Sequence, residues 1–291
     1  MHNENTQHPT PNTQLLNLGC GQRFHNEWIN VDFHATGKGV IAYNLNKGIP
    51  FNNETFDVVY HSHIIEHFAK EDAPKFLAEC YRVLKSNGII RVAFPDLEQI
   101  VLHYIRLLTL LKNGNSQYEA DYDWIMLELY DQTVRNISGG DMLKYFICDS
   151  IPNEEFVLER CGIEVKNLIM YGKSLFSNPK SVNEIGKSSF IQLLKRMKKS
   201  VNIKRRIKEG LFGKKHSLEE KIGKFRLGGE IHQWMYDSYS LGRLLKNAGF
   251  KKICVRDAYS SYLENWSKYN LDTEPDGSIY KPDSSYIEGI K

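Results

Sequence analysis

Short apolar segments alternate with polar turns over the first third of the chain. Five of these segments have the length and apolar content of buried β-strands. They are residues 15–18, 28–32, 40–43, 57–60 and 89–94. Between the last two, residues 73–84 repeat apolar positions at helical spacing, which predicts a helix that stops at 85–88, where a glycine follows a basic turn. This alternation is typical of βαβ units and predicts a parallel sheet.

The pattern changes after the fifth predicted strand. Residues 100–111 and 122–134 have helical spacing, and the α/β pattern resumes only with a helix at 238–247 and a strand at 252–255. We therefore predict one doubly wound α/β domain with a mainly helical insert after strand five. The predicted divisions are a disordered leader, the first part of the α/β core, the insert or lid, and the second part of the core with its tail. They comprise residues 1–14, 15–98, 99–228 (with a basic stretch at 195–226) and 229–291.

A glycine-rich turn follows the first predicted strand. Gly19-Cys20-Gly21 places bare backbone at the carboxyl end of the sheet, where a ligand can approach main-chain N–H groups. Such a turn also serves simply to pack a helix on a strand. The next strand ends in Asp32, whose carboxylate can there accept both ribose hydroxyls of a nucleoside. A capping role at the strand end is the alternative for Asp32.

Several short motifs then follow in a fixed order. They are Asn-Leu-Gly-Cys-Gly at 17–21, Trp-Ile-Asn-Val-Asp at 28–32, Ile-Pro-Phe at 49–51, Phe-Asp-Val-Val-Tyr at 56–60, Ile-Ile-Glu-His at 64–67 and Arg-Val-Leu-Lys-x-x-Gly at 82–88. In this order they resemble the class I S-adenosylmethionine (SAM)-dependent methyltransferases, and more narrowly a bacterial group linked to surface-saccharide synthesis. Segments 232–237 and 271–277 are similar to the ending of that group. The resemblance covers residues 15–98 and 229–288.

The resemblance implies a Rossmann-like seven-stranded sheet, SAM as the cofactor, and a set of cofactor-binding residues. That set is Asn17, Gly19, Cys20, Gly21, Asp32, Asn44, Leu45 and His61. The chain departs from the family pattern at Arg23, which stands where a third glycine is expected, and at Asn44, where aspartate is usual. Asn44 can still accept from the adenine amino group, without charge. The connection from Gly19 to Glu27 is also short for a parallel crossover.

Side chains able to handle a proton gather just after the fourth predicted strand. If this stretch is helical, His63, Glu66 and His67 share one face by their spacing. Histidine titrates near neutral pH, so His63 or His67 can take the proton that an acceptor hydroxyl loses. His232, which begins the second shared segment, joins them as a candidate catalytic residue. The alternative is that Glu66 and His67 only pair within a strand-to-helix junction.

The same residues have two metal-binding interpretations. His-x-x-Glu-His is a zinc-peptidase motif, but here it follows a buried strand inside a nucleotide-binding pattern, which argues against a peptidase. The stretch is also similar to the Glu-x-x-Glu-His of some O-methyltransferases that hold a divalent ion with a distant histidine. If a metal is bound, the expected ligands are His63, Glu66, His67 and His232, and the ion would polarise a substrate hydroxyl. We favour a simple base without a metal.

Composition and charge indicate in which compartment the protein is located and which kinds of partner it can bind. The net charge is +3, and the five cysteines are scattered without a Cys-x-x-Cys pair, as in a reducing compartment. With no apolar signal segment and no long apolar run, we expect a cytoplasmic protein. Five apolar residues from Phe190 to Val201 follow helical spacing among basic residues. Region 190–226 could therefore contact a membrane surface or an anionic substrate, or form an ordinary packed helix, while sparse aromatic residues disfavour nucleic acid.

These observations together predict an O-methyltransferase that acts on a saccharide, either free or linked to a carrier. The saccharide is implied by the resemblance alone. Another small metabolite or RNA is the alternative acceptor. Outside enzymes, the chain could be a SAM-binding partner protein that does no chemistry, although the intact histidine cluster argues against this.

Overall fold

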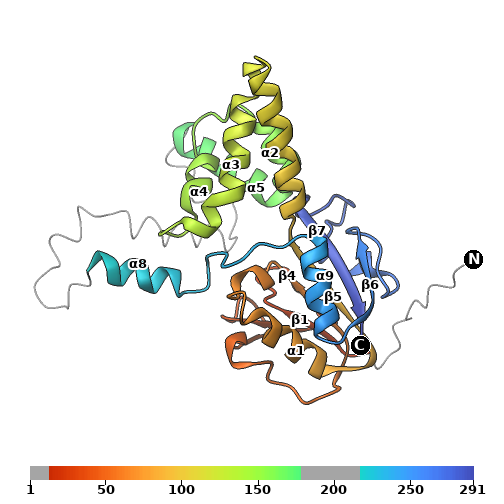
Figure 1. The fold of residues 1–291 in the computed structure, drawn as a ribbon. Coiled ribbons are helices and arrows are strands. Elements are labelled where there is room, and N and C mark those ends of the chain that lie inside the picture. Colours follow the sequence, from red (N-terminus) through yellow and green to blue (C-terminus); the bar gives the residue numbers. More distant parts are fainter. Residues whose placement is uncertain (1–12, 178–216) are drawn as a thin grey trace, which may run out of the picture.

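Seven strands form one sheet in the computed structural model, which describes residues 13–177 and 217–291. The strands are β1 Leu15–Leu18, β2 Ile29–Asp32, β3 Val40–Ala42, β4 Phe56–Ser62, β5 Leu84–Pro95, β6 Lys251–Arg256 and β7 Ser284–Ile290. They lie in the order β3-β2-β1-β4-β5-β7-β6, with β1 to β5 parallel and β7 antiparallel to both of its neighbours (Figure 1). The strand order reverses beside β1, as in doubly wound sheets. The predicted seven-stranded α/β fold is confirmed.

Helices cover one face of this sheet and form a separate group beyond its carboxyl edge. They are α1 Ala73–Val83, α2 Leu97–Lys112, α3 Glu119–Val134, α4 Gly140–Phe146, α5 Glu154–Ser177, α8 Leu218–Arg226 and α9 Ser238–Asn247. The short 3-10 turns are η1 Leu45–Lys47, η2 Ile65–His67, η3 Ser116–Tyr118 and η5 Trp266–Tyr269. Apolar side chains of α1 and α9, such as Leu77 and Leu245, share the main core with the sheet. None of the helices in the described ranges is long and apolar enough to cross a membrane.

The connection between β1 and β2, residues 19–28, contains no helix, so the opposite face of the sheet needs another cover. A segment from the other end of the described chain supplies it. Trp28 meets Trp266 and Tyr269 edge-to-face, with ring centroids 5.9 and 5.3 Å apart. Leu263 and Leu271 complete this second apolar cluster. The short crossover is therefore compatible with parallel pairing of β1 and β2, because η5 takes the place of a crossover helix.

Helices α2 to α5 form the predicted insert after β5 and stand together above the sheet (Figure 1). They have an apolar core of their own, centred on the fully buried Trp124 and Ile125. A buried ion pair between Arg160 and Glu128, with N and O 2.6 Å apart, crosses this core. Helix α2 starts at Leu97, three residues before the predicted 100, because the carboxylate of Asp96 accepts from the N–H of Gln99 and caps the helix.

Two details of the sequence interpretation are wrong or incomplete. The glycine stop expected at 85–88 does not end a helix there, because α1 ends at Val83 and β5 begins at Leu84. Helices α4, α5 and α8 were not predicted. The apolar stripe from Phe190 to Val201, most of the basic stretch and most of the predicted leader lie outside the described residues.

Candidate functional site

The glycine turn and Asp32 meet at the carboxyl ends of β1 and β2. Gly19 and Gly21 have φ angles of 63° and 53°, a conformation that glycine adopts readily. The carboxylate of Asp32 accepts from the N–H of Gly21 at 2.8 Å, and more weakly from that of His34 at 3.3 Å. A Cβ built at Gly21 would meet no atom within 4 Å. Open backbone beside a half-buried carboxylate fits the ribose of a nucleoside cofactor.

Three further predicted cofactor residues support this turn from within. The space beside the Cα of Gly19 is occupied by the side chain of Ile64, and a Cβ at Gly19 would collide with it. Asn17 is buried, and its amide donates to the carbonyl of Arg23 at 2.9 Å and to the side chain of Asn30 at 3.1 Å. Burial, helped by Asp32, raises the pKa of the Cys20 thiol to about 12, so the thiol stays protonated. These three residues shape the turn, and its open side is formed by Gly21 and Asp32.

The remaining cofactor candidates are placed differently from one another. Asn44 caps η1, where its side chain accepts from the N–H of Asn46 at 3.0 Å, and Leu45 packs against the main core. His61 is fully buried, and its ring meets Phe76 edge-on at 5.1 Å. Burial lowers the pKa of His61 to about 3, so its ring is uncharged. The His61 ring thus packs into the main core, and its assignment to the cofactor site stays a prediction.

Arg23 connects the glycine turn to a distant loop, residues 272–283, which we call the tail loop. The guanidinium donates to the carbonyl of Thr273 at 3.0 Å and to Glu274 at 2.9 Å. It also lies 3.8 Å from the centre of the Tyr280 ring. The replacement of the third glycine by arginine thus has a structural reason, because this side chain anchors the tail loop beside the cofactor turn.

The proton-handling residues are brought together, although the predicted helical face is wrong. Only one 3-10 turn, η2, forms here, and His63 precedes it with a left-handed φ of 53°. The Nδ1 atom of His63 lies 3.4 Å from Oε1 of Glu66, and its Nε2 atom lies 2.8 Å from the hydroxyl of Ser284. His63 therefore connects η2 to the start of β7, a contact that the spacing did not predict.

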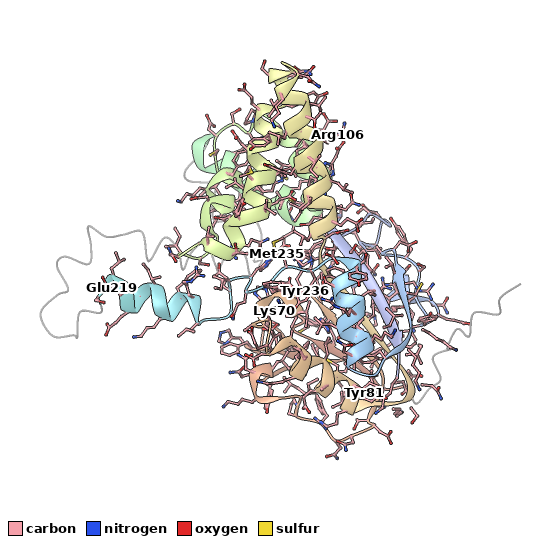
Figure 2. The ribbon with its side chains drawn as sticks, viewed as in Figure 1. Lys70, Tyr81, Arg106, Glu219, Met235 and Tyr236 are labelled. Atoms are coloured by element: carbon pink, nitrogen blue, oxygen red, sulfur yellow. The ribbon has the colours of Figure 1, made fainter. Side chains whose placement is uncertain are left out.

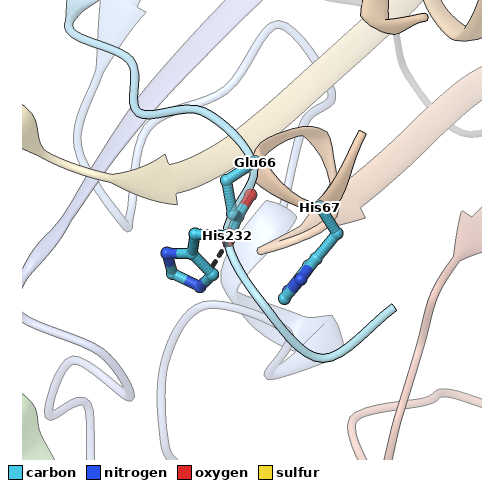
Figure 3. A group of neighbouring side chains, drawn as sticks. All are labelled: Glu66, His67 and His232. Atoms are coloured by element: carbon cyan, nitrogen blue, oxygen red, sulfur yellow. Dashed lines mark ion pairs between the residues drawn. The ribbon is translucent and has the colours of Figure 1, made fainter. Parts of the chain in front are cut away.

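His232 reaches the cluster through a segment that connects α8 to α9, residues 230–236, which we call the junction segment. Its backbone docks on η2, where the N–H of Gln233 donates to the carbonyl of Glu66 at 2.7 Å. The Nε2 atom of His232 lies 4.0 Å from Oε1 of Glu66, and the rings of His232 and His67 meet edge-to-face at 4.9 Å (Figure 3). Figure 2 shows Met235 and Tyr236 between the insert and the sheet. The junction segment thus places His232 beside Glu66 and His67.

Burial dominates the electrostatics of the cluster. The Glu66 side chain is 1% exposed, neither carboxylate oxygen has a hydrogen-bond partner in the described chain, and burial raises its pKa. Burial, assisted by the positive charge of Lys281, lowers the pKa of His63 to about 3. Burial and the neighbouring histidines lower the pKa of His232 well below its ordinary value. Both rings are therefore uncharged near neutral pH, and each keeps a nitrogen lone pair that can accept a hydrogen bond.

A cavity of about 360 Å³ adjoins the cluster, between the helical insert and the carboxyl edge of the sheet. His63 and Pro95 line it from the sheet, while apolar and charged side chains line it from the insert, the junction segment and the tail loop. The apolar ones are Met142, Leu143, Phe146, Val165 and Leu168, and the charged ones are Arg135, Glu164, Glu230, Lys281 and Asp283. The sequence analysis identified none of these ten, because they come from distant segments and belong to no common motif.

Comparison with known families adds to this geometry. Residues 33–92 match the model of a family described as a methyltransferase domain. The match supports a SAM-dependent methyltransferase. This methyltransferase match begins directly after Asp32, includes His63, Glu66 and His67, and leaves the acceptor open.

Solved methyltransferase structures are similar to most of this chain at low identity. A SAM-dependent methyltransferase from Thermotoga maritima is 13% identical, with 97% of this chain and 84% of that chain covered and a TM-score of 0.37. One from Archaeoglobus fulgidus is 12% identical, with 97% and 87% covered and a TM-score of 0.36. Phosphoethanolamine N-methyltransferase 2 from Haemonchus contortus, in complex with SAM, is 10% identical, with 97% and 50% covered and a TM-score of 0.34. No curated protein matches the chain.

Proposed function

We propose that this protein transfers a methyl group from SAM to a hydroxyl of a saccharide bound in the 360 Å³ cavity. When bound, SAM supplies an electrophilic methyl group on a sulfonium. Gly21 and Asp32 would hold its nucleoside part, and His63, which lines the cavity, would take the proton that the acceptor hydroxyl loses. The observation that carries the proposal is this acceptor cavity, which has an uncharged histidine in its wall.

The lining of the cavity suits an uncharged, hydroxyl-rich ligand. Its charged side chains are largely paired with one another: Lys281 lies 3.5 Å from Glu164, and Arg135 lies 3.5 Å from Glu230. Two buried atoms, Nε of Arg135 and Oδ1 of Asp283, have no hydrogen-bond partner among the described residues. One is a donor and the other a carboxyl oxygen, so hydroxyl groups, which both donate and accept, can satisfy them. The cavity lining has two cationic side chains and three carboxyl groups, which favours such a ligand over a diphosphate.

The apolar side of the cavity supports the same class of acceptor. Phe146 and Leu143, from the insert core, face the lumen together with Val165. Binding sites for small molecules combine mostly apolar walls with a few placed polar groups. A sugar ring presents apolar C–H groups as well as hydroxyls, so it can use both sides of the cavity.

Mass spectrometry of the purified protein with SAM and a panel of saccharides and nucleotide sugars tests the proposal. We expect one panel member to gain the mass of one methylene group and SAM to be converted to its demethylated product. Amines and other small metabolites belong in the same panel. A mass gain confined to those compounds would overturn the saccharide acceptor while keeping the methyltransferase.

Asp32→Ala should weaken SAM binding by about 1–3 kcal/mol, because the ribose hydroxyls lose their acceptor. The variant also removes the acceptor of the Gly21 N–H, so the turn loses a contact as well. Calorimetric titration measures the change. Asp57→Ala is the matched control, because Asp57 pairs with Lys85 at the start of β4, at the opposite end of the strands. Equal SAM affinity of wild type and Asp32→Ala would contradict the assigned site.

A further inference from the structure

We propose that Glu66, His67 and His232 bind a divalent transition-metal ion. One ligand atom from each of the three residues lies within 4.8 Å of the other two. Glu66 and His67 belong to η2, and His232 belongs to the junction segment, so the site bridges two segments far apart in sequence (Figure 3). Two imidazoles and one carboxylate form a ligand set that zinc, cobalt, manganese and iron(II) accept.

The buried carboxylate of Glu66 supports the metal site independently of the spacing of the ligand atoms. It is buried, and neither oxygen has a hydrogen-bond partner within residues 13–177 and 217–291. Nδ1 of His63 lies 3.4 Å and Nε2 of His232 lies 4.0 Å from Oε1 of this carboxylate. A buried carboxylate without a partner is unfavourable, and a bound cation is one of the few arrangements that satisfies it.

The hydrogen bond of His67 prepares its ring for a metal. Nδ1 of His67 lies 3.1 Å from the carbonyl oxygen of Ile231. A carbonyl only accepts, so Nδ1 donates, and this leaves Nε2 as the ring nitrogen that faces away from the bond and can bind a metal. Metal-bound histidines almost always fix their tautomer through such a bond. The backbone of the second ligand is held as well, because the N–H of His232 donates to the carbonyl of Gln132 at 2.9 Å.

Three protein ligands leave coordination positions open, as in metal sites that act on a substrate. His63 touches Glu66 and lines the acceptor cavity, so the proposed ion lies next to that cavity. There it would polarise the acceptor hydroxyl and make its proton easier to remove. This catalytic role rests on the proposed function, whereas the metal site itself does not.

Titration of the chelator-treated full-length protein with Zn²⁺, Mn²⁺ and Co²⁺ tests the site without any methyl acceptor. We expect one ion per chain by calorimetry, and absorption bands of a protein-bound ion with Co²⁺. Glu66→Gln, which keeps the shape of the side chain, and His67→Ala should each weaken binding by roughly 100-fold or more. His103→Ala, on α2 and outside the cluster, is the matched histidine control and should bind as the wild type does.

The metal site would be overturned if the wild type bound none of the three ions. It would also be overturned if Glu66→Gln bound the ion as tightly as the wild type does. Circular dichroism identifies variants that do not fold, and the isosteric Glu66→Gln keeps the test decisive if His67→Ala is one of them. SAM binding is measured on the same samples with and without the ion. Metal binding without SAM binding would contradict the proposed function alone, and SAM binding without metal binding would contradict the metal site alone.

Discussion

Replacing Arg91 with methionine should lower the free energy of unfolding by about 3–5 kcal/mol. Arg91 is fully buried on β5, with Nε 2.8 Å from Asp272 and Nη1 3.1 Å from Glu288. The guanidinium also donates to the carbonyl of Ser260 and lies 4.5 Å from the centre of the Trp266 ring. Its removal takes the cation away from the buried Asp272 and leaves Glu288 with Arg256, which lies 3.2 Å away. Chemical denaturation measures the loss.

The loss of stability in the Arg91 variant should depend on pH. Burial raises the pKa of Asp272, and the positive charge of Arg91 opposes this rise. Without Arg91, the folded state binds a proton on Asp272 more readily than the unfolded state does, so acid favours folding of the variant. The difference from wild type should therefore be smaller at about pH 5 than at about pH 8.

Lys85→Met is the control for the Arg91 variant on the same strand. Lys85 is 38% exposed and pairs with Asp57 at 2.8 Å. An ion pair this exposed to water contributes only about 0–1 kcal/mol to the free energy of unfolding. If both variants lost the same free energy of unfolding, the buried ion pairs of Arg91 would contribute no more to stability than the exposed pair of Lys85.

Replacing His63 with asparagine should lower methyl transfer by roughly 10²–10⁴-fold, the usual contribution of a general base. Asparagine is the suitable substitution, because His63 has a φ of 53° and asparagine tolerates this left-handed conformation better than alanine does. SAM affinity should stay unchanged, since Asp32 and Gly21 lie on the ends of other strands. Turnover is measured with the acceptor found by mass spectrometry.

Ser284→Ala separates the imidazole itself from its orientation. It removes the hydroxyl that lies 2.8 Å from Nε2 of His63 and leaves the ring in place. We expect a smaller fall in turnover than in His63→Asn, because the remaining ring can still take the proton. If His63→Asn kept wild-type turnover, another group would have to accept the proton, and His63 would be a structural link between η2 and β7.

Elements with a strong local pattern were predicted closely. The bounds of β1, residues 15–18, agree with its apolar run, and α9, at 238–247, begins after a capping box of Asp237 and Ser240. The bounds of β1 and the start of α9 depend only on residues that are close together in the sequence. The Gly-x-Gly turn and the acid at the end of β2 also follow a local rule, and they meet as expected.

The sequence alone did not predict the acceptor cavity, because its walls come together only through the packing of segments that are far apart along the chain. The tail loop crosses α5 at Gly162, where a Cβ would lie 2.6 Å from the carbonyl oxygen of Tyr280. This close approach places Lys281 and Asp283 in the wall of the cavity. The left-handed backbone of His63 is likewise set by its surroundings, because histidine has only a weak preference for that conformation.

The place of β7 in the sheet sets the order in which the molecule can assemble during synthesis. β7 is the last strand along the described chain, yet it lies between β5 and β6, and in the described sheet β6 pairs with β7 alone. Strands β1 to β5 leave the ribosome long before residues 284–290, with the whole insert in between. Until those residues arrive, β5 has an unpaired edge, which can template pairing with another chain. The nascent protein is therefore most exposed to aggregation at β5, throughout the time needed to make the insert.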